Sequence, residues 1–390
     1  MSLRYLTACE SHGPALTAIL EGMPAGLPLS EELIARDLAR RQTGTGAGDR
    51  MAIEKDRAQI LAGVMEGVTT GAPIALQLLN KDHANWKGKA VPAYVTPRPG
   101  HADLAAAVKY GYDDIRPSLE RASARETAAR VAVGAVCRAF LQSFGITVGG
   151  YVASIGESAA ALEGLSFEER LLRARTSDVQ CPDPTAASHI NAAIAKAHDA
   201  GETLGGVIEI VALHLPVGLG SHVNWDRRLD ARLAHAVLGV PAIKGVAFGD
   251  AFANTLNPGT HANDAIVPAA DGTLERRSNA CGGIEGGISN GQPVWLRVAM
   301  KSIPTTRKGQ DTVDLATGQP CLTYYERSDV CPVPRAVVVL EAVVAIALAD
   351  ALIEKLGGDS LAEMKPRFDT LRRATLKDLR MNGQPHLFWP

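Results

Sequence analysis

The sequence predicts one compact α+β unit in which long helices alternate with short strands. Hydrophobic residues make up 46% of the 390 residues and charged residues 21%, which is typical of a folded globular chain. No linker or change in composition divides the chain and no internal repeat is visible, so residues 1–390 are expected to form a single domain. The same alternation also fits a parallel α/β sheet, and the composition leaves both arrangements open.

The first part of the chain predicts a helix, a strand and a long loop. A helix is expected from Ser30 to about Arg41, because Ser30 can cap it and two glutamates follow in its first turn. A glycine-rich loop over residues 43–50 comes next. Residues 71–79 predict a turn and a strand, and residues 81–100 form a polar loop with three prolines. Loops of that length usually carry function or are mobile.

Later segments predict helices that pack in the interior. Ser123 and Glu126 have the spacing of a capping box, so a buried helix is expected from about Ser123 to near Gly145. Residues 334–356 predict a long helix that is apolar on nearly all sides and must therefore be covered. Periodicity and β-branched content predict further elements, namely helices over 185–200 and 226–238 and a strand over 205–213.

The charge balance and the apolar stretches argue against two kinds of partner. Lysine and arginine number 40 and aspartate and glutamate 42, a net charge of −2, so no overall positive field would recruit nucleic acid. The apolar stretch over residues 336–349 is interrupted by Glu341, which leaves it shorter than the roughly 18 uncharged residues of a membrane span. The first twelve residues contain no apolar run of a signal peptide, so a cytoplasmic location is expected.

The cysteines and histidines do not predict a metal site. No two of the six cysteines have C-x-x-C spacing, and the ten histidines show no H-x-x-x-H arrangement on a predicted helix. Reduced thiols in a cytoplasmic protein are therefore expected, and no metal.

Two histidine motifs are candidates for proton transfer. Residues 10–13 (Glu-Ser-His-Gly) place a hydroxyl beside His12, and a histidine there can act as a general acid for a leaving oxyanion. Residues 98–103 place Arg98 and His101 on either side of a Pro-Gly turn, which suits an anion held beside a proton donor. Taken alone, each motif also fits an ordinary polar turn with a solvated side chain.

Three more motifs are candidates for binding anions or flat ligands. Residues 121–126 put Ser123 and Arg125 at a helix start, where N–H groups and the helix dipole favour a phosphate or carboxylate. Residues 282–291 contain five glycines, which either leave backbone N–H groups open to a ligand or form a simple turn system. Residues 327–331 place Arg327 and Asp329 before the apolar helix, as a salt-bridged cap or as part of an active site.

The motifs of P-loop, dinucleotide-binding, serine hydrolase, zinc protease and kinase proteins are absent from the sequence. The arginines and histidines together favour a phosphorylated, carboxylated substrate.

In order and in kind, these motifs resemble those of the chorismate synthases. The likeness runs from about Arg4 to Leu361, so a tail from about residue 362 lies outside it. The matching segments are residues 10–13, 40–41, 98–103, 123–127, 225–230, 242–245, 282–287 and 327–329. The resemblance implies a β-α-β sandwich with helices between antiparallel sheets.

The same resemblance implies a carbon–oxygen lyase of the shikimate pathway of aromatic amino acid biosynthesis. Such an enzyme converts 5-enolpyruvylshikimate 3-phosphate to chorismate and phosphate by 1,4-anti elimination. The family requires reduced FMN (FMNH2), with NADPH here only an external source of reducing equivalents, delivered by a separate flavin reductase. A homotetramer is also implied.

Specific roles follow from the resemblance. His12 would protonate the departing phosphate, His101 would protonate or stabilise the reduced flavin near N1, and Asp329 would assist a proton relay at N5. Ser11 and Ser123 would make supporting contacts. The cations expected around the phosphate and carboxylates are Arg41, Arg50, Arg98, Arg125 and Arg327. The residues expected against the flavin are Arg121, Ala122, Ser123, Pro241, Ala242, Gly286, Lys301, Ser302, Ile303, Pro304, Thr305 and Arg327.

The chain departs from the family pattern at several positions. Ala47 stands where the family commonly has an arginine that touches substrate or a nicotinamide cofactor, Cys9 where glycine is usual, and Ser302 where proline is usual. Loss of one buried charge-assisted contact costs about 1.5–3 kcal/mol, or about ten- to hundredfold in affinity. Two alternatives therefore stay open: a diverged flavin-dependent paralogue acting on another phosphorylated cyclohexene acid, and a non-catalytic flavin-binding protein.

Overall fold

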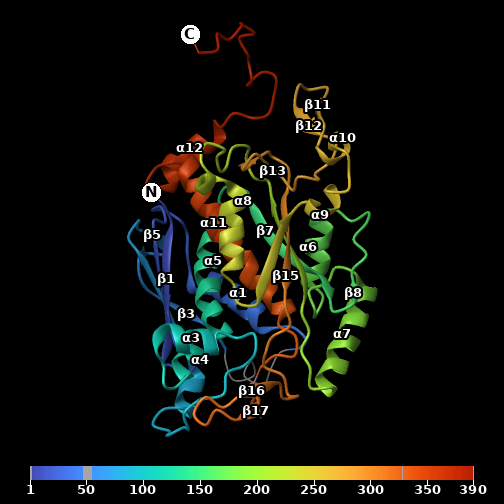
Figure 1. Ribbon diagram of the computed structural model, residues 1–390. Coiled ribbons are helices and arrows are strands. Elements are labelled where there is room, and N and C mark those ends of the chain that lie inside the picture. The colour runs from blue at the N-terminus through green and yellow to red at the C-terminus, as the bar shows by residue number, and fades with distance from the viewer. Residues whose placement is uncertain (1, 47–54, 327, 390) are drawn as a thin grey trace.

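Two antiparallel sheets face each other across a layer of helices in the computed structural model, which describes residues 2–46, 55–326 and 328–389 (Figure 1). The four-stranded sheet has the order β1 (Arg4–Ala8), β2 (Ala15–Glu21), β6 (Ile74–Leu79) and β3 (Ala58–Ala62). The five-stranded sheet has the order β10 (Ile243–Phe248), β15 (Val294–Met300), β9 (Gly206–Leu213), β7 (Thr147–Ile155) and β8 (Ser158–Ala159). The helices between them are α1 (Glu31–Gln42), α5 (Thr127–Gln142), α8 (Leu229–Leu238) and α11 (Val333–Leu356). The predicted α+β class is confirmed, and the parallel α/β alternative is wrong.

The four-stranded sheet buries one face and turns the other outward. On β2, Leu16, Ala18 and Leu20 are buried and alternate with residues that are more open to solvent. That alternation is what a strand with one covered face requires. Because β1 pairs with β2 directly, the short connection between them carries His12 to one end of the sheet.

In the five-stranded sheet, β7 and β9 are buried along nearly their whole length. Helix α11 covers one face, where Val337 approaches Gly150, and α6 (Phe167–Arg175) covers the other, where Leu171 approaches Gly149. With both faces covered, the strands have no polar side to alternate with. Helix α7 (Pro184–Asp199) lies on the same outer side as α6 (Figure 1).

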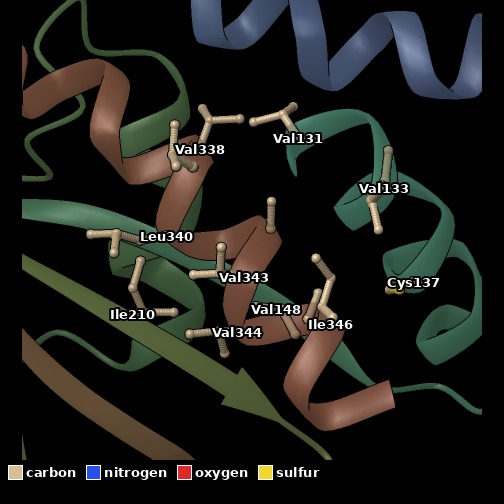
Figure 2. Close-up of a cluster of buried hydrophobic side chains, with 14 of the residues drawn as sticks. Val131, Val133, Cys137, Val148, Ile210, Val338, Leu340, Val343, Val344 and Ile346 are labelled. Carbon is tan, nitrogen blue, oxygen red and sulfur yellow. The ribbon is translucent and has the colours of Figure 1, made fainter. Parts of the chain in front are cut away.

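Helix α11 forms the centre of the core, as its apolar sequence predicted. Val338, Leu340, Val343 and Ile346 of this helix lie among side chains of α5, β7 and β9 (Figure 2). By length and composition α11 could cross a membrane, but 89% of its most apolar window is buried inside the protein. We therefore assign it as the core helix.

One carboxylate lies within this apolar layer and is fully neutralised there. Glu341 is 2% exposed and accepts hydrogen bonds from Arg40 at 2.7 and 3.0 Å. Arg138 and the main-chain N–H of Gly150 also donate to it, at 3.2 and 2.9 Å. Arg138 binds Asp37 as well, at 2.9 Å. The network ties α1, α5 and β7 to α11.

The crossing of α5 and α11 leaves no room for a side chain at Gly134. A Cβ atom built there would lie 2.5 Å from the Cα of Ala342. We expect Gly134→Ala to lower the free energy of unfolding by about 1–3 kcal/mol, because overpacking outweighs the helix propensity of alanine, a gain of about 1 kcal/mol. Chemical denaturation measures this loss. Gly259→Ala is the control, since the nearest atom to its added Cβ would be 3.9 Å away; equal stability of the two variants would contradict the prediction.

Shorter elements complete the described part of the chain. The helices are η1 (Lys81–Asn85), α3 (Asp103–Tyr110), α4 (Arg116–Arg121), η2 (Ala124–Glu126), η3 (Trp225–Arg227), α9 (Ala251–Asn254), α10 (Gly259–Ala262) and α12 (Leu361–Asp369). The strands are β4 (Val64–Met65), β5 (Val68–Thr69), β11 (Ile266–Pro268), β12 (Leu274–Arg276), β13 (Ile284–Glu285), β14 (Ile288–Ser289), β16 (Asp311–Val313) and β17 (Pro320–Leu322). Helices α3 and α4 and the β16–β17 hairpin gather at one end of the molecule, the lower end in Figure 1.

The predicted elements agree with the structure to within a few residues, except at two helix starts. Ser123 caps a helical turn as predicted, accepting from the main-chain N–H of Arg125, but this turn is η2, α5 begins only at Thr127, and Glu126 does not complete the capping box. Glu126 instead accepts hydrogen bonds from Thr7 at 2.6 Å and from Arg130 at 2.9 Å, because a cation one turn along is a stronger partner than the backbone. The helix expected from residue 226 begins at Leu229, after η3.

Candidate functional site

Residues 98–103 form a compact group of charges where the loop enters α3. Asp103 is fully buried and accepts hydrogen bonds from the main-chain N–H of Arg98 at 3.1 Å and from its Nε at 2.8 Å. His101 Nδ1 lies 2.5 Å from the second carboxylate oxygen. Burial alone would raise the pKa of Asp103, but hydrogen bonds from His101 and Arg98 lower it well below its ordinary range. The carboxylate therefore stays ionised and fixes the side chains of both Arg98 and His101.

The segment after β15 lies against this group. Lys301 Nζ donates to the carbonyl of Gly100 at 2.8 Å, and Arg98 donates to Thr305 Oγ1 at 3.4 Å. The main-chain N–H of Lys301 donates to the carbonyl of Ala242 at 3.0 Å. Residues far apart in the sequence, at 98–103, 241–242 and 301–305, are thereby brought together.

A cavity of about 450 Å³ opens beside the same segment. Its lining residues are Pro99, Glu202, Thr203, Lys301, Ser302, Ile303, Pro304, Thr306, Lys308, Gly309 and Gln310. Four of the residues that the sequence predicts against the flavin, 301–304, are thus neighbours around one cavity. Its volume falls in the range of about 300–1,000 Å³ that is usual for ligand and cofactor sites.

A second group consists of two buried arginines that share one carboxylate. Arg125 NH1 lies 2.7 Å from both oxygens of Asp56, and Arg41 NH1 lies 3.7 Å from the same carboxylate. Arg41 also donates to Thr127 Oγ1, at 3.1 Å from Nε and 2.9 Å from NH2. Both guanidinium groups are thereby held at one carboxylate in the interior.

Asp329 links these two groups. It forms an ion pair with Arg335 in the first turns of α11, and Arg335 lies close enough to Arg41 for their charges to repel. On the other side, Ser328 Oγ donates to the carbonyl of Thr305 at 3.0 Å. The segment before α11 therefore runs between the arginine pair and the residues that line the cavity.

His12 belongs to a third group, at the turn between β1 and β2. Its Nδ1 lies 2.7 Å from one oxygen of Glu120, and its main-chain N–H donates to the other oxygen at 2.8 Å. The ring of Trp86 lies 4.2 Å from the imidazole, centroid to centroid. Asn80 donates to the carbonyls of residues 11 and 13, at 2.7 and 2.9 Å, and so fixes the turn. The imidazole remains 16% exposed.

The segment from α4 to η2 connects the His12 group to the arginine pair. Glu120 lies near the end of α4, and Arg121 donates to the carbonyl of Thr7 at 3.4 Å. Ala122 follows α4, and Ser123 Oγ accepts from the main-chain N–H of Arg125 at 3.3 Å. Ser11 is buried. The predicted residues at 11–12, 121–123 and 125 are therefore linked through one stretch of chain.

Gly286 lies apart from the other predicted flavin residues. It forms the turn between β13 and β14, and its neighbour Gly283 approaches Pro293, just before β15. Lys301 follows the other end of that seven-residue strand, which separates the two positions by about 20 Å. Arg50, Ala47 and Arg327 lie outside the described residues.

The structure adds site residues that the sequence did not single out: Asp56, Glu120, Arg335 and Trp86. The linear sequence carries no signal for these contacts, because Asp56 is 69 residues from Arg125 and Glu120 is 108 residues from His12. The sequence included Asp103 only as the last residue of the 98–103 motif and gave it no role of its own. No cluster of three or more possible metal ligands occurs in the described parts of the chain.

Comparison with known proteins gives a consistent result. The family model for chorismate synthase matches residues 3–353. A chorismate synthase of Geobacter metallireducens is 51% identical over 383 residues, covering 94% of this chain and 98% of its own length. One of Desulforamulus reducens is 52% identical over 377 residues, with 94% and 97% covered. A crystal structure of chorismate synthase superposes with a TM-score of 0.78 at 44% identity, covering 95% of this chain and 97% of its own.

The fold and the matches define an α+β enzyme of the carbon–oxygen lyase class. The chain belongs to the chorismate synthase family, whose members act in the shikimate pathway and work with a flavin.

Proposed function

We propose that this chain catalyses 1,4-anti elimination of phosphate from 5-enolpyruvylshikimate 3-phosphate to give chorismate. The observation that supports this most directly is the placement of Arg98, His101 and Asp103 beside the cavity lined by residues 301–304. A fixed cation, a proton carrier and room for a flat ring are what this elimination needs in one place.

The groups around the cavity fit reduced FMN. Lys301 and Lys308 supply positive charge for a phosphate or an anionic ring, and the hydroxyls of Thr203 and Thr306 and the main chain of residues 301–304 supply polar partners. The residues proposed to hold the cofactor at this cavity are 121–123, 241–242, 301–305 and 327, whereas Gly286, predicted with them, lies at the far end of β15. When bound, reduced FMN would lend electron density as the C–O bond breaks, with no net redox change.

Two histidines would carry the protons. His12 would donate one to the leaving phosphate, with Ser11 in support, and His101 would hold a proton toward the reduced ring. Asp103 lies against Nδ1 of His101, so the cofactor would be reached from Nε2, which also lies 3.4 Å from NH2 of Arg98. Asp329, which is held by Arg335, would assist proton movement near N5 of the flavin.

The arginines would hold the substrate's anionic groups. Arg41, Arg98 and Arg125 are already fixed by carboxylates, so they would stabilise the charge that develops on phosphate without reorganising. Arg50 and Arg327 belong to the same proposal.

We also infer the assembly of the enzyme, its location and its source of reducing equivalents from the family. We propose that residues 1–390 act as one unit in a cytoplasmic homotetramer, and that NADPH serves only through an external flavin reductase. The absence of arginine at position 47 supports the last point, because that arginine is expected at a nicotinamide site.

Anaerobic assay with reduced FMN and 5-enolpyruvylshikimate 3-phosphate tests the proposal. Phosphate and chorismate should appear together, and His12→Ala and His101→Ala should each lower kcat by on the order of 10²-fold or more, because each removes a proton carrier. His261→Ala is the control, since His261 is exposed on α10. Absence of both products in the unmodified protein would overturn the proposal. Phosphate release from a different cyclohexene acid would favour the paralogue, and an unperturbed flavin spectrum would exclude flavin binding.

A further inference from the structure

The carboxylate of Glu120 makes two hydrogen bonds to the same residue. One oxygen accepts from the main-chain N–H of His12 at 2.8 Å, and the other lies 2.7 Å from its Nδ1. Both groups are largely buried, with the imidazole 16% and the carboxylate 13% exposed. Burial alone would raise the pKa of Glu120, but hydrogen bonds from the ring and main chain of His12 lower it. The carboxylate is therefore ionised at neutral pH and fixes both the position and the rotation of the ring.

Charged and titratable groups approach His12 from three elements. Helix α4 contributes Glu120 and, beyond it, Arg116, whose charge also acts on Glu120. On η1, His83 Nδ1 lies 2.9 Å from the carbonyl of His12, and Asp82 accepts from Trp86 Nε1 at 3.4 Å. Glu10 lies on the same turn as His12. Among these groups, Glu120 is the one whose carboxylate the structure places on the ring nitrogen.

A neighbouring aromatic ring packs against the imidazole. The centroid of the Trp86 ring lies 4.2 Å from that of His12, with an interplanar angle of 43°. With Nδ1 occupied by Glu120, Nε2 is the nitrogen that remains for an external proton acceptor.

We propose that Glu120 is a positioning residue whose carboxylate holds the N–H of His12 Nδ1 and so orients Nε2 to donate to the leaving phosphate. The inference rests on the proposed function, in which His12 is the proton donor. Each of the two histidines then has a carboxylate at its Nδ1, Glu120 at His12 and Asp103 at His101. Glu120 touches neither substrate nor cofactor and acts only through His12.

Glu120→Gln tests this with two independent readouts. On the alkaline side of its pH profile, kcat should begin to fall at a lower pH than in the unmodified protein. Activity at pH 8 should therefore fall by about tenfold while KM changes less than twofold. The ¹⁵N spectrum of the His12 ring, assigned by difference from His12→Asn, should show less imidazolium at pH 7 in the variant. Glu120→Asp keeps the charge and should recover part of both signals.

Glu10→Gln is the matched control, because it removes a carboxylate two residues from His12 without touching the ring contact. An unchanged spectrum and pH profile in Glu120→Gln would overturn the inference, and so would equal shifts in both variants, which would indicate a diffuse charge effect. Failure of the unmodified protein to release phosphate would sink the proposed function instead, and the ¹⁵N spectrum would still decide the role of Glu120.

Discussion

Replacing Asp103 by asparagine is expected to lower kcat/KM by about 10³-fold, the largest loss of activity among the changes considered. The buried carboxylate accepts from Arg98 at three nitrogens and from Nδ1 of His101. An amide of the same shape would turn one of these acceptors into a donor, so His101 would lose its orientation or Arg98 its partner. A carboxylate that orients a catalytic histidine contributes up to about 10⁴-fold in other enzymes.

Steady-state phosphate release measures this effect, and Asp113→Asn serves as the control because Asp113 is exposed on the loop before α4. The pKa of Asp103 lies below its ordinary value, so its contribution to stability is present at neutral pH and is lost only as the pH falls through the acid range. Asp103→Asn should therefore show less acid sensitivity of unfolding than the unmodified protein. Activity within threefold of normal would contradict the assigned role.

Removing the carboxylate of Glu341 is expected to destabilise the fold by about 3–5 kcal/mol, because Arg40 and Arg138 would be left with too little negative charge in a buried layer. Denaturation of Glu341→Ala measures the loss. Glu354→Ala on the same helix is the control: its ion pair with Arg232, at 2.6 Å, is 53% exposed on the glutamate side, and such surface pairs contribute about 0–1 kcal/mol. Similar losses in the two variants would show that the buried network is not special.

The pH dependence of the same network has a definite sign. Burial alone would raise the pKa of Glu341, but the charges of Arg40 and Arg138 lower it below its ordinary value of 4.5. The stability that Glu341 contributes is therefore present above pH 4.5 and is lost as the pH falls below it. A Glu341→Gln variant should unfold with a weaker dependence on acid.

The sequence was a good guide to elements whose causes are local. The apolar run before Leu356 and the serine cap at Ser30 each act within a few residues, and α11 and α1 were predicted nearly to their ends. At residues 123–126 the serine cap was predicted correctly, but the role of Glu126 was not, because Glu126 binds Thr7 and Arg130, of which only Arg130 is near in the sequence. Local pattern cannot rank a distant partner against a neighbouring one.

In the candidate site, the functional side chains themselves were easier to predict from the sequence than the residues that hold them in place. His12 and His101 stood out because each lies in a recognisable motif, whereas Glu120 and Asp56 are single acidic residues in ordinary surroundings. Their roles arise only when the fold brings them to His12 and Arg125. Gly286 illustrates the reverse case, since the motif named it and the folded chain keeps it at the far end of β15 from Lys301.

The position of α11 has a consequence for biosynthesis. The five-stranded sheet rests on a helix that leaves the ribosome only after residue 332, and the main-chain N–H of Leu3 is bound by Asp350, 347 residues away. At about 5–20 residues per second, the inner face of β7 would wait roughly ten to forty seconds for its cover. A nascent chain stalled before α11 should therefore bind chaperones. The yield of folded protein should depend more on the amount of chaperone in the cell than on growth temperature alone.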